Sequence, residues 1–464
     1  MGTVLRGGTV VDRGEYRADI RIDGPVIAAI GHDIVHEGDT VIDIDGCYLL
    51  PGGIDPHTHF DLDVGTTVTA DNFASGTKAA LVGGTTTIID FATQAKGGTL
   101  QGALSEWQDK AAGQCFADYG FHMAITDFND NIASEMRELV NGRGVTSFKL
   151  YMAYKQNLQV DDGVIFKTLR HSREIGALTG FHCENGDVIE ALVQQARRAG
   201  QTSPRFHALT RPAGAEAEAT QRVIALAEIA AAPLYIVHLS CAGALTAVRA
   251  AKARGVPVYA ETCPQYLLLD EACYEADGFE AAKYVMSPPL RGKTDRAALW
   301  DSLRSGVLDT VGTDHCSFNF YGQKELGRND FSKIPNGCPG VEHRLALLYT
   351  YGVLTGKITL SQLVAYTATN AAQLFGLFPR KGTLAPGSDA DIVVWNPAFS
   401  TVITAAAQTQ QVDYTPYEGW SQQGRAEYVF LRGFLAAQGG SVCDEPRGQY
   451  INRKPFAGRR GLND

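Results

Sequence analysis

The chain has 464 residues, of which 45% are hydrophobic, and a formal net charge of −10 at pH 7. This acidic balance argues against nucleic acid or an anionic membrane as the main partner. No apolar run reaches the roughly 18 residues of a membrane-spanning helix, and the first residues do not have the pattern of a signal peptide. The nine cysteines include no C-x-x-C pair, which indicates a reduced, cytoplasmic protein.

Both ends of the chain have the sequence pattern of short strands that alternate with turns. Residues 1–50 contain TVLRGGTVVDRG and VIDIDG, and the same style returns in residues 382–443 with FLRGFLAAQGG. Because the two glycine-rich segments look alike, we predict one small, discontinuous, β-sandwich-like domain built from both ends. Residues 444–464 are basic and weakly patterned, and we predict a C-terminal arm that docks on another subunit or a disordered tail.

Residues 51–381 alternate between β-branched runs and amphipathic helical stretches. The eight expected strands are GIDPHTHF, TTTIIDF, DYGFHMAIT, VTSFKLYM, ALTGFHCE, LYIVHLS, VPVYAET and DTVGTDH. This repetition predicts an α/β fold of the (β/α)8 type, a TIM-like barrel. A doubly wound open sheet fits less well, because no G-x-G-x-x-G turn follows the first strand.

Polar side chains gather at the ends of these strands, where a barrel of this kind places its active site. DPHTHF puts His57 and His59 two residues apart, so that both imidazoles leave the strand on the same side. A single strand-end histidine is more often a hydrogen-bonded core residue, but four of them together predict a metal centre. The strand-end residues are His57, His59, Asp90, Lys149, His182, His238, Glu261 and Asp314.

Asp314 in GTDHC ends the last strand, where it could be a simple N-cap. Beside a divalent metal it would instead ligate the ion and exchange protons with a bound water. The alternation of the strand turns His315 away from this site. By the same alternation Cys183 and Cys316 are expected to be packing residues.

Lys149 stands within the apolar run VTSFKLYMAYK. Its ammonium could reach a strand end along a buried stem, but the alternation aims it inward, toward the histidines. Burial and nearby metal would lower its pKa, and the neutral amine could then react with CO₂ to give a carbamate that bridges two metals. The rival interpretation is a Schiff-base lysine, which leaves the four histidines unexplained.

Motifs along nearly the whole chain closely resemble the D-hydantoinase/dihydropyrimidinase group of cyclic amidohydrolases. They include DPHTHF, SFKLYMAYK, HCENGD, KYVMSPPLR, GTDHCSFNF, IPNG and GTLAPGSDADIVVWNP. The resemblance implies a binuclear site, usually zinc although Mn²⁺ or Co²⁺ also suit such ligands, and a homotetramer. It implies metal ligands at His57, His59, Lys149 (as the N6-carboxylated bridge), His182, His238 and Asp314.

The resemblance also implies the substrate and its contacts. Tyr154 would hydrogen-bond the developing oxyanion, and Ser287 and Asn336 would hold the cyclic imide. Asp314, as general acid/base, would move a proton from the bridging hydroxide to the leaving ring nitrogen, so that hydantoins or dihydropyrimidines open to N-carbamoyl amino acids.

The resemblance leaves alternative functions to compare. Phe60 and Asp61 follow His59 in place of the arginine typical of dihydroorotase-like enzymes, which disfavours an acidic substrate. Allantoinase-like hydrolysis of a cyclic ureide stays open. A non-catalytic scaffold relative is disfavoured because all six ligand positions are filled.

Overall fold

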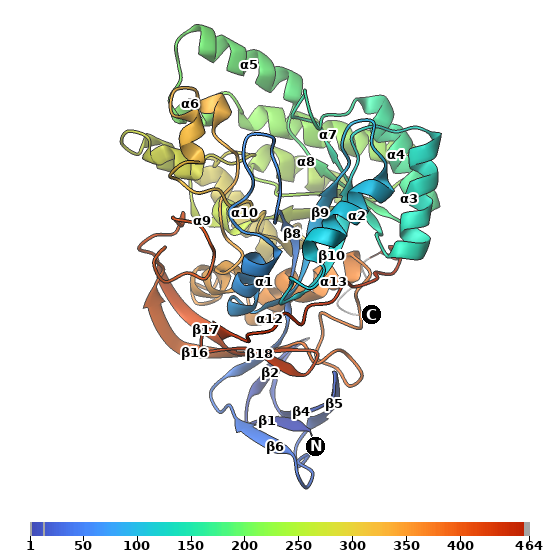
Figure 1. Ribbon diagram of the computed structural model, residues 1–464, viewed down its shortest axis with the longest axis vertical. Helices are drawn as coiled ribbons and strands as arrows, with labels where there is room; N and C mark the ends of the chain where they lie inside the picture. The colour runs from blue at the N-terminus through green and yellow to red at the C-terminus, as the bar shows by residue number, and fades with distance from the viewer. Residues whose placement is uncertain (1, 13, 459–464) are drawn as a thin grey trace.

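The computed structural model describes residues 2–12 and 14–458 and contains three β-sheets (Figure 1). The largest is an eight-stranded sheet in which neighbouring strands pair in parallel and follow one another in chain order. All eight strands lie where the sequence predicts them, and the (β/α)8 barrel is confirmed. The strands are β8 (Gly53–Thr58), β9 (Thr85–Thr93), β10 (Asp118–Ala124), β11 (Ser147–Tyr151), β12 (Leu178–His182), β13 (Leu234–Ile236), β14 (Val258–Thr262) and β15 (Thr310–Val311).

Residues of the first strand contact residues that directly follow the last strand, and these contacts close the sheet. Thr58 and His315 form a parallel bridge, and the Thr313 hydroxyl donates to Asp55 at 2.6 Å. The guanidinium of Arg344 is fully buried at the same seam, where its Nη1 donates to the carbonyls of Ile54 and Val311. A buried guanidinium needs such partners, because an unpaired buried charge is very costly.

Helices follow the strands and cover the outside of the barrel (Figure 1). Several begin at a side-chain cap, such as Asn72, Asn129 and Asp161, because these side chains satisfy a free N–H of the first turn. The α-helices are α1 (Phe73–Val82), α2 (Leu100–Ala111), α3 (Asp130–Arg143), α4 (Asp162–Glu174), α5 (Gly186–Arg198), α6 (Arg205–Leu209), α7 (Ala213–Ala230), α8 (Ala242–Ala253), α9 (Pro264–Leu268), α10 (Lys293–Arg304), α11 (Arg344–Leu348), α12 (Leu360–Val364) and α13 (Asn370–Leu374).

Six short helical turns complete the helical content of the described residues. They are η1 (Glu271–Glu275), η2 (Glu280–Tyr284), η3 (Lys324–Gly327), η4 (Phe331–Lys333), η5 (Tyr349–Val353) and η6 (Ala365–Thr369). Of these, η3 and η4 lie in the segment that follows the last barrel strand, on the side of the strand ends. This segment therefore contributes to the surroundings of the expected active site.

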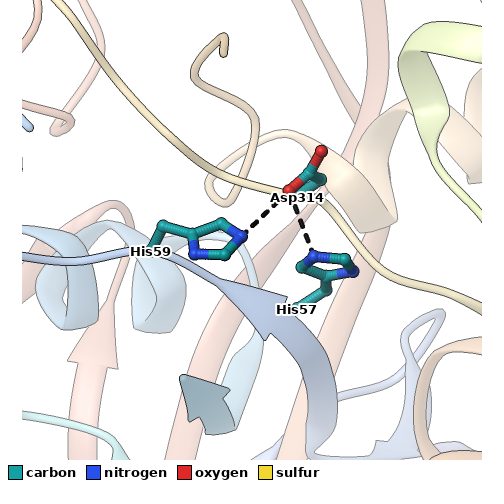
Figure 2. A group of neighbouring side chains, drawn as sticks. All are labelled: His57, His59 and Asp314. Carbon is teal, nitrogen blue, oxygen red and sulfur yellow. Dashed lines mark ion pairs between the residues drawn. The ribbon is translucent and has the colours of Figure 1, made fainter. Parts of the chain in front are cut away.

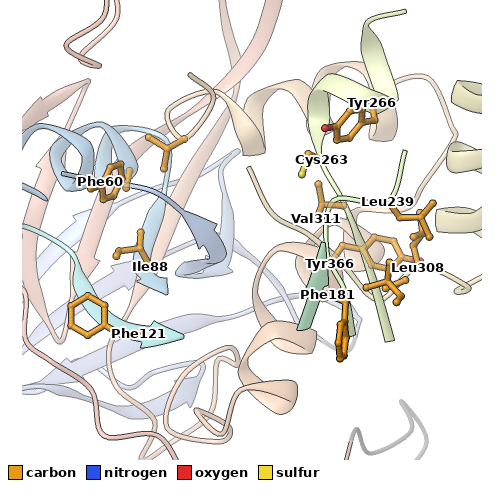
Figure 3. Close-up of a cluster of buried hydrophobic side chains, with 14 of the residues drawn as sticks. Phe60, Ile88, Phe121, Phe181, Leu239, Cys263, Tyr266, Leu308, Val311 and Tyr366 are labelled. Atoms are coloured by element: carbon orange, nitrogen blue, oxygen red, sulfur yellow. The ribbon is translucent and has the colours of Figure 1, made fainter. Parts of the chain in front are cut away.

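The main hydrophobic core lies between the barrel strands and the helices, as Figure 3 shows for part of it. Phe121 of β10 meets Phe73 of α1 edge to face, with ring centroids 6.1 Å apart. Phe148 and Leu150 of β11 join this core, whereas Lys149 between them lines the barrel interior. The alternation of side chains along a strand thus separates the packing face from the face that carries the chemistry.

The other two sheets combine segments from both ends of the chain. The seven-stranded sheet has the order β19-β18-β17-β16-β7-β2-β3, and the four-stranded sheet has the order β5-β4-β1-β6. Leu5, Ile20, Ile392 and Phe430 belong to the apolar cluster that these strands share. The strands are β1 (Thr3–Arg6), β2 (Thr9–Val11), β3 (Glu15–Arg17), β4 (Asp19–Asp23), β5 (Val26–Gly31), β6 (Thr40–Asp43), β7 (Tyr48–Pro51), β16 (Ile392–Val402), β17 (Ser421–Leu431), β18 (Phe434–Gln438) and β19 (Ser441–Val442).

The two similar glycine-rich segments are divided between these sheets. β2 and β18 lie in the seven-stranded sheet, whereas β1 belongs to the four-stranded one. The bounds 1–50 and 382–443 for a discontinuous domain, with 51–381 for the barrel, stay a prediction.

The chain after β19 packs against its own barrel. Ile451 donates its N–H to the Tyr119 carbonyl at 2.8 Å, and buried Arg453 donates to the Ser147 hydroxyl at 2.9 Å. The described part of the predicted arm, up to residue 458, is therefore held on β10 and β11 of the same chain. The remainder of the predicted arm or tail, residues 459–464, lies outside the described residues.

None of the described helices is long and apolar enough to cross a membrane. All nine cysteines are free, and six of them are buried. Their burial agrees with the expectation that most of them are packing residues.

Candidate metal centre and active site

Two histidines and one aspartate meet where the first and last barrel strands end (Figure 2). Oδ1 of Asp314 lies 3.1 Å from Nε2 of His57 and 3.2 Å from Nε2 of His59. His57 lies in β8 and His59 directly after it, so the strand delivers both rings to one side, as the sequence predicts. The three atoms converge on one point, which is the arrangement that a divalent metal ion requires.

The other two predicted histidines form a second pair beside the first group. Nδ1 of His182 lies 3.0 Å from Nε2 of His238, and the rings of His238 and His57 are 5.3 Å apart between centroids. Nε2 of His182 is 2.9 Å from Glu184, so a proton on Nε2 leaves the lone pair of Nδ1 directed at His238. Nδ1 of His182 and Nε2 of His238 thus lie side by side at this pair.

Three of the predicted site residues have the left-handed backbone conformation that non-glycine residues seldom adopt. The φ angles are +37° at His238, +52° at Asp314 and +65° at Tyr154. Such conformations cost free energy and persist where the surrounding structure enforces them, commonly at functional sites. Here they occur at two predicted ligands and at the predicted oxyanion donor.

Lys149 is 1% exposed and extends from β11 into the barrel interior. Its Nζ lies 4.8 Å from the ring centroid of Phe91 and 5.1 Å from that of Tyr151, and no carboxylate in the described chain lies within ion-pair distance. Burial lowers the pKa of Lys149 to about 8, with the charges of Asp314 and Glu261 opposing the shift. This environment makes the neutral amine accessible near neutral pH.

The side chains of the first group shift one another's pKa values. Burial alone would lower the pKa of His57, but Glu261 and Asp314 on its two sides raise it to about 9. Burial would raise the pKa of Asp314, but His57 and His59 hold it well below its usual value. His57 thus lies between two carboxylates, with Nδ1 facing Glu261 and Nε2 facing Asp314.

Buried carboxylates contact His57 and His182 through the ring nitrogen that does not face the neighbouring site residue. Oε1 of Glu261 lies 2.6 Å from Nδ1 of His57, and Oε2 accepts a hydrogen bond from Tyr235 at 2.8 Å. Glu184, which contacts His182, is paired with Arg211 at 2.9 Å. Carboxylates in this position fix the tautomer of a metal-binding histidine and raise its basicity.

The sequence alone predicts no role for these acids. It places Glu261 at a strand end, and it singles out neither Glu184 nor Arg211. Glu184 follows His182 by two residues, which is a signal that sequence reasoning could have used. Glu261 is 204 residues from His57, so no local pattern connects them.

Replacing Glu261 with glutamine is expected to weaken metal binding about 10- to 100-fold, because the neutral amide no longer supports the charge on a metal-bound His57. Competition with a chelator of known affinity measures this change. Glu228→Gln, on the exposed face of α7, is the matched control. An unchanged affinity in Glu261→Gln would contradict the orienting role.

Two of the three predicted substrate residues, Tyr154 and Asn336, help to line a cavity of about 200 Å³ together with Arg211. The ring centroid of Tyr154 lies 5.1 Å from that of His182, which connects the cavity to the histidine pair. Ser287 is buried, and its hydroxyl has no well-aligned partner in the described chain. Burial raises the pKa of Tyr154 to about 12, so the phenol keeps its proton and can donate it in a hydrogen bond.

The remaining strand-end residues have structural partners. Asp90 accepts hydrogen bonds from Thr58 at 2.8 Å and from the Phe60 N–H at 2.9 Å. His315 lies 3.0 Å from Asp71 through Nε2, while its Nδ1 accepts backbone hydrogen bonds from residues 340 and 341. These contacts agree with leaving His315 outside the predicted ligand set.

A second acidic group, formed by Asp118, Asp389 and Asp391, lies away from this site. Lys381 places its Nζ 2.7 Å from Asp118 and 2.5 Å from Asp391. The ammonium therefore already supplies the positive charge, and this group is a buried ion-pair network. The histidine-rich site, by contrast, fits metal ions through its donor set and its convergent nitrogens.

Comparison with known proteins agrees with the barrel and its histidines. The sequence model of the amidohydrolase family matches residues 48–435. The chain belongs to the amidohydrolase family. This membership implies divalent metal binding at a site of the kind that the histidines and Asp314 form.

Full-length relatives resemble the chain closely. A D-hydantoinase of Geobacillus stearothermophilus is 47% identical over 98% of this chain and 97% of its own length. The crystal structure of a dihydropyrimidinase from Brevibacillus agri is 50% identical, with a TM-score of 0.98 over 98% of this chain and 100% of that one. An L-hydantoinase from Arthrobacter aurescens is 29% identical, with a TM-score of 0.88 over 97% of this chain and 99% of that one.

Proposed function

We propose that the protein hydrolyses the ring amide of hydantoins or dihydropyrimidines and releases an N-carbamoyl amino acid. The observation that carries this proposal is the convergence of His57, His59 and Asp314 beside the His182–His238 pair, at the mouth of a barrel and next to a ring-sized cavity. Relatives named D-hydantoinase and dihydropyrimidinase, 47% and 50% identical over nearly the whole chain, support the same activity.

The four histidines, Lys149 and Asp314 would hold two divalent metal ions, and we favour Zn²⁺. His57, His59 and Asp314 would bind one ion, and His182 and His238 the other. When bound, the ions would polarise the scissile carbonyl and lower the pKa of the attacking water.

Lys149 would join the two ions as its carbamate. Support comes from its burial, the lack of a carboxylate partner within ion-pair distance in the described chain, and a pKa lowered to about 8. An unpaired buried ammonium is unfavourable, and the carbamate replaces it with an anion next to cations. The carbamate forms when the neutral amine attacks CO₂ and loses one proton.

Asp314 would act as the general acid/base. Its carboxylate lies within hydrogen-bonding distance of two imidazoles and has a pKa held well below its usual value, so it is ionised at the start of turnover. It would take the proton of the attacking water and give it to the ring nitrogen as the C–N bond breaks. Ser287 and Asn336 would orient the ring so that this nitrogen faces Asp314.

Tyr154 would donate its phenolic hydrogen to the oxyanion of the transition state. Tyr154→Phe is expected to lower kcat by about 10²- to 10³-fold with a smaller change in KM, because the bond forms fully only in the transition state. Steady-state kinetics on hydantoin measure both constants. Tyr321→Phe, on an exposed ring, is the control, and an unchanged kcat in Tyr154→Phe would contradict the assignment.

A substrate panel tests the proposed function. Metal-replete enzyme is given hydantoin, 5-substituted hydantoins, dihydrouracil and allantoin, and the products are resolved on a chiral column. We expect turnover of the hydantoins and dihydrouracil, with D-configured products from the 5-substituted hydantoins, in keeping with the higher identity to the D-hydantoinase than to the L-hydantoinase. Activity on allantoin alone would instead support a ureide hydrolase.

We further propose that the enzyme acts in the cytoplasm as a homotetramer. The free, mostly buried cysteines agree with a reducing compartment. Exposed apolar residues near the site, including Val64, Val68 and Leu326, agree with contacts between subunits. Sedimentation equilibrium measures the assembly state.

A further inference from the structure

A second buried lysine, Lys324, lies beside the substrate residues and has no part in the proposed chemistry. It begins η3 and is fully buried. Its Nζ donates hydrogen bonds to three backbone carbonyls, at 2.8 Å to Val285, 2.8 Å to Pro335 and 2.7 Å to Gly337. The three donors of one ammonium thus meet three acceptors.

The partners of Lys324 are unusual for a buried cation. No carboxylate in the described chain forms an ion pair with it, and its Nζ is surrounded by the three carbonyls and the ring of Phe318, whose centroid lies 6.0 Å away. Burial lowers the pKa of Lys324 to about 7. Burying a charge in this way is expensive, and an apolar side chain of the same length would fill the space at lower cost. This free-energy cost indicates that Lys324 does more than fill space in the core.

The three carbonyls belong to the two segments that hold the predicted substrate contacts. Val285 precedes Ser287 by two residues, and Pro335 and Gly337 stand on either side of Asn336. In the described chain, Lys324 is the one side chain that donates to the backbone of both segments. Lys324 therefore joins the two segments through its side chain.

The same two segments are also connected to each other and to the chain that follows β15. The N–H of Gly337 donates to the Val285 carbonyl at 3.0 Å, and the N–H of Cys316 donates to the Cys338 carbonyl at 3.2 Å. A side chain at residue 337 would collide with Cys316, because an added Cβ would lie 2.3 Å from its carbonyl oxygen. The segments thus pack tightly against the chain two residues after Asp314.

We propose that Lys324 is a positioning residue that holds the Ser287 and Asn336 segments at the spacing the cyclic substrate requires. This inference rests on the proposed function for the roles of Ser287 and Asn336. Lys324 itself does not reach the substrate, because all three of its N–H groups are used by the backbone. Its loss is expected to disturb substrate binding more than the chemical step.

The positioning role is tested with Lys324→Met, which keeps the length and removes the donors, and with the milder Lys324→Gln, which keeps an amide donor. We expect KM for hydantoin to rise about tenfold in Lys324→Met, with a smaller fall in kcat and an unchanged metal content. Lys324→Gln is expected to be intermediate. Hydrogen exchange at residues 285–288 and 335–338 is expected to be faster in both variants, because the shared anchor is lost.

The matched control is Lys381→Met, which removes another buried lysine far from these segments. It is expected to lower the melting temperature without changing KM or exchange in the two segments. Unchanged KM and exchange in a folded Lys324→Met protein would overturn the proposal, as would equal effects in Lys381→Met.

If the wild-type protein hydrolysed none of the substrates, the proposed function would be wrong, and the exchange measurement would still decide the role of Lys324. Faster exchange confined to the two segments would support it. Exchange equal to that of the wild type would overturn it.

Discussion

Lys149→Ala is expected to lose bound metal and activity together. The substitution removes the atom that would carry the carbamate, and four neutral histidines with Asp314 then face two cations with too little negative charge. We expect metal content to fall from about two ions per chain to one or fewer, because a two-metal centre loses its bridge. The turnover of hydantoin is expected to fall by roughly 10⁴-fold, because removing one member of a group of residues that act as a unit costs about as much activity as removing the whole group.

Elemental analysis of the purified protein and steady-state kinetics measure these two quantities. Lys167→Ala, on the exposed face of α4, is the matched control and is expected to keep both. Normal turnover in Lys149→Ala would rule out the bridging role. Trapping of substrate on Lys149 by borohydride, in a protein without stoichiometric metal, would favour the Schiff-base alternative instead.

Asp314→Asn is expected to separate metal binding from catalysis. The amide oxygen of asparagine occupies the place of Oδ1 and can still contact the ion, but asparagine cannot carry a proton between water and the leaving nitrogen. We therefore expect most of the metal to remain while kcat falls by about 10²- to 10⁴-fold, the usual contribution of a positioned acid/base.

The same two measurements apply to this variant, with Asp109→Asn on the exposed face of α2 as control. A variant with full metal and wild-type kcat would show that Asp314 moves no proton. A variant with neither metal nor activity would assign Asp314 a purely ligating role.

Much of the barrel could be predicted because strand periodicity is a local property. Phe148, Lys149 and Leu150 show why: the alternation alone separates the packing side from the inner side, and the structure places them on those sides. The site followed from the same reasoning, since parallel strands bring their carboxyl ends to one rim. The structure gathers His57, His59 and Asp314 there, and their chemical roles stay predictions.

The residues that sequence reasoning missed act across long separations. Glu261 contacts His57 over 204 positions, and Arg344 joins β8 to β15 over 290 positions at Ile54. No local sequence pattern can predict either contact, because the residues become neighbours only in the folded chain. The docking of Arg453 on β10 and β11 is of the same kind, and it holds the described part of the predicted arm against the barrel.

The sequence by itself determined the barrel, the order of its strands and the types of residue at their ends, because hydrophobic periodicity and side-chain chemistry are written in neighbouring positions. Only the tertiary structure decided which acids orient the histidines, how the two terminal sheets divide the strands, and that Lys324 holds two distant segments together. These features depend on the distances between atoms that lie far apart in the chain, and packing alone sets those distances.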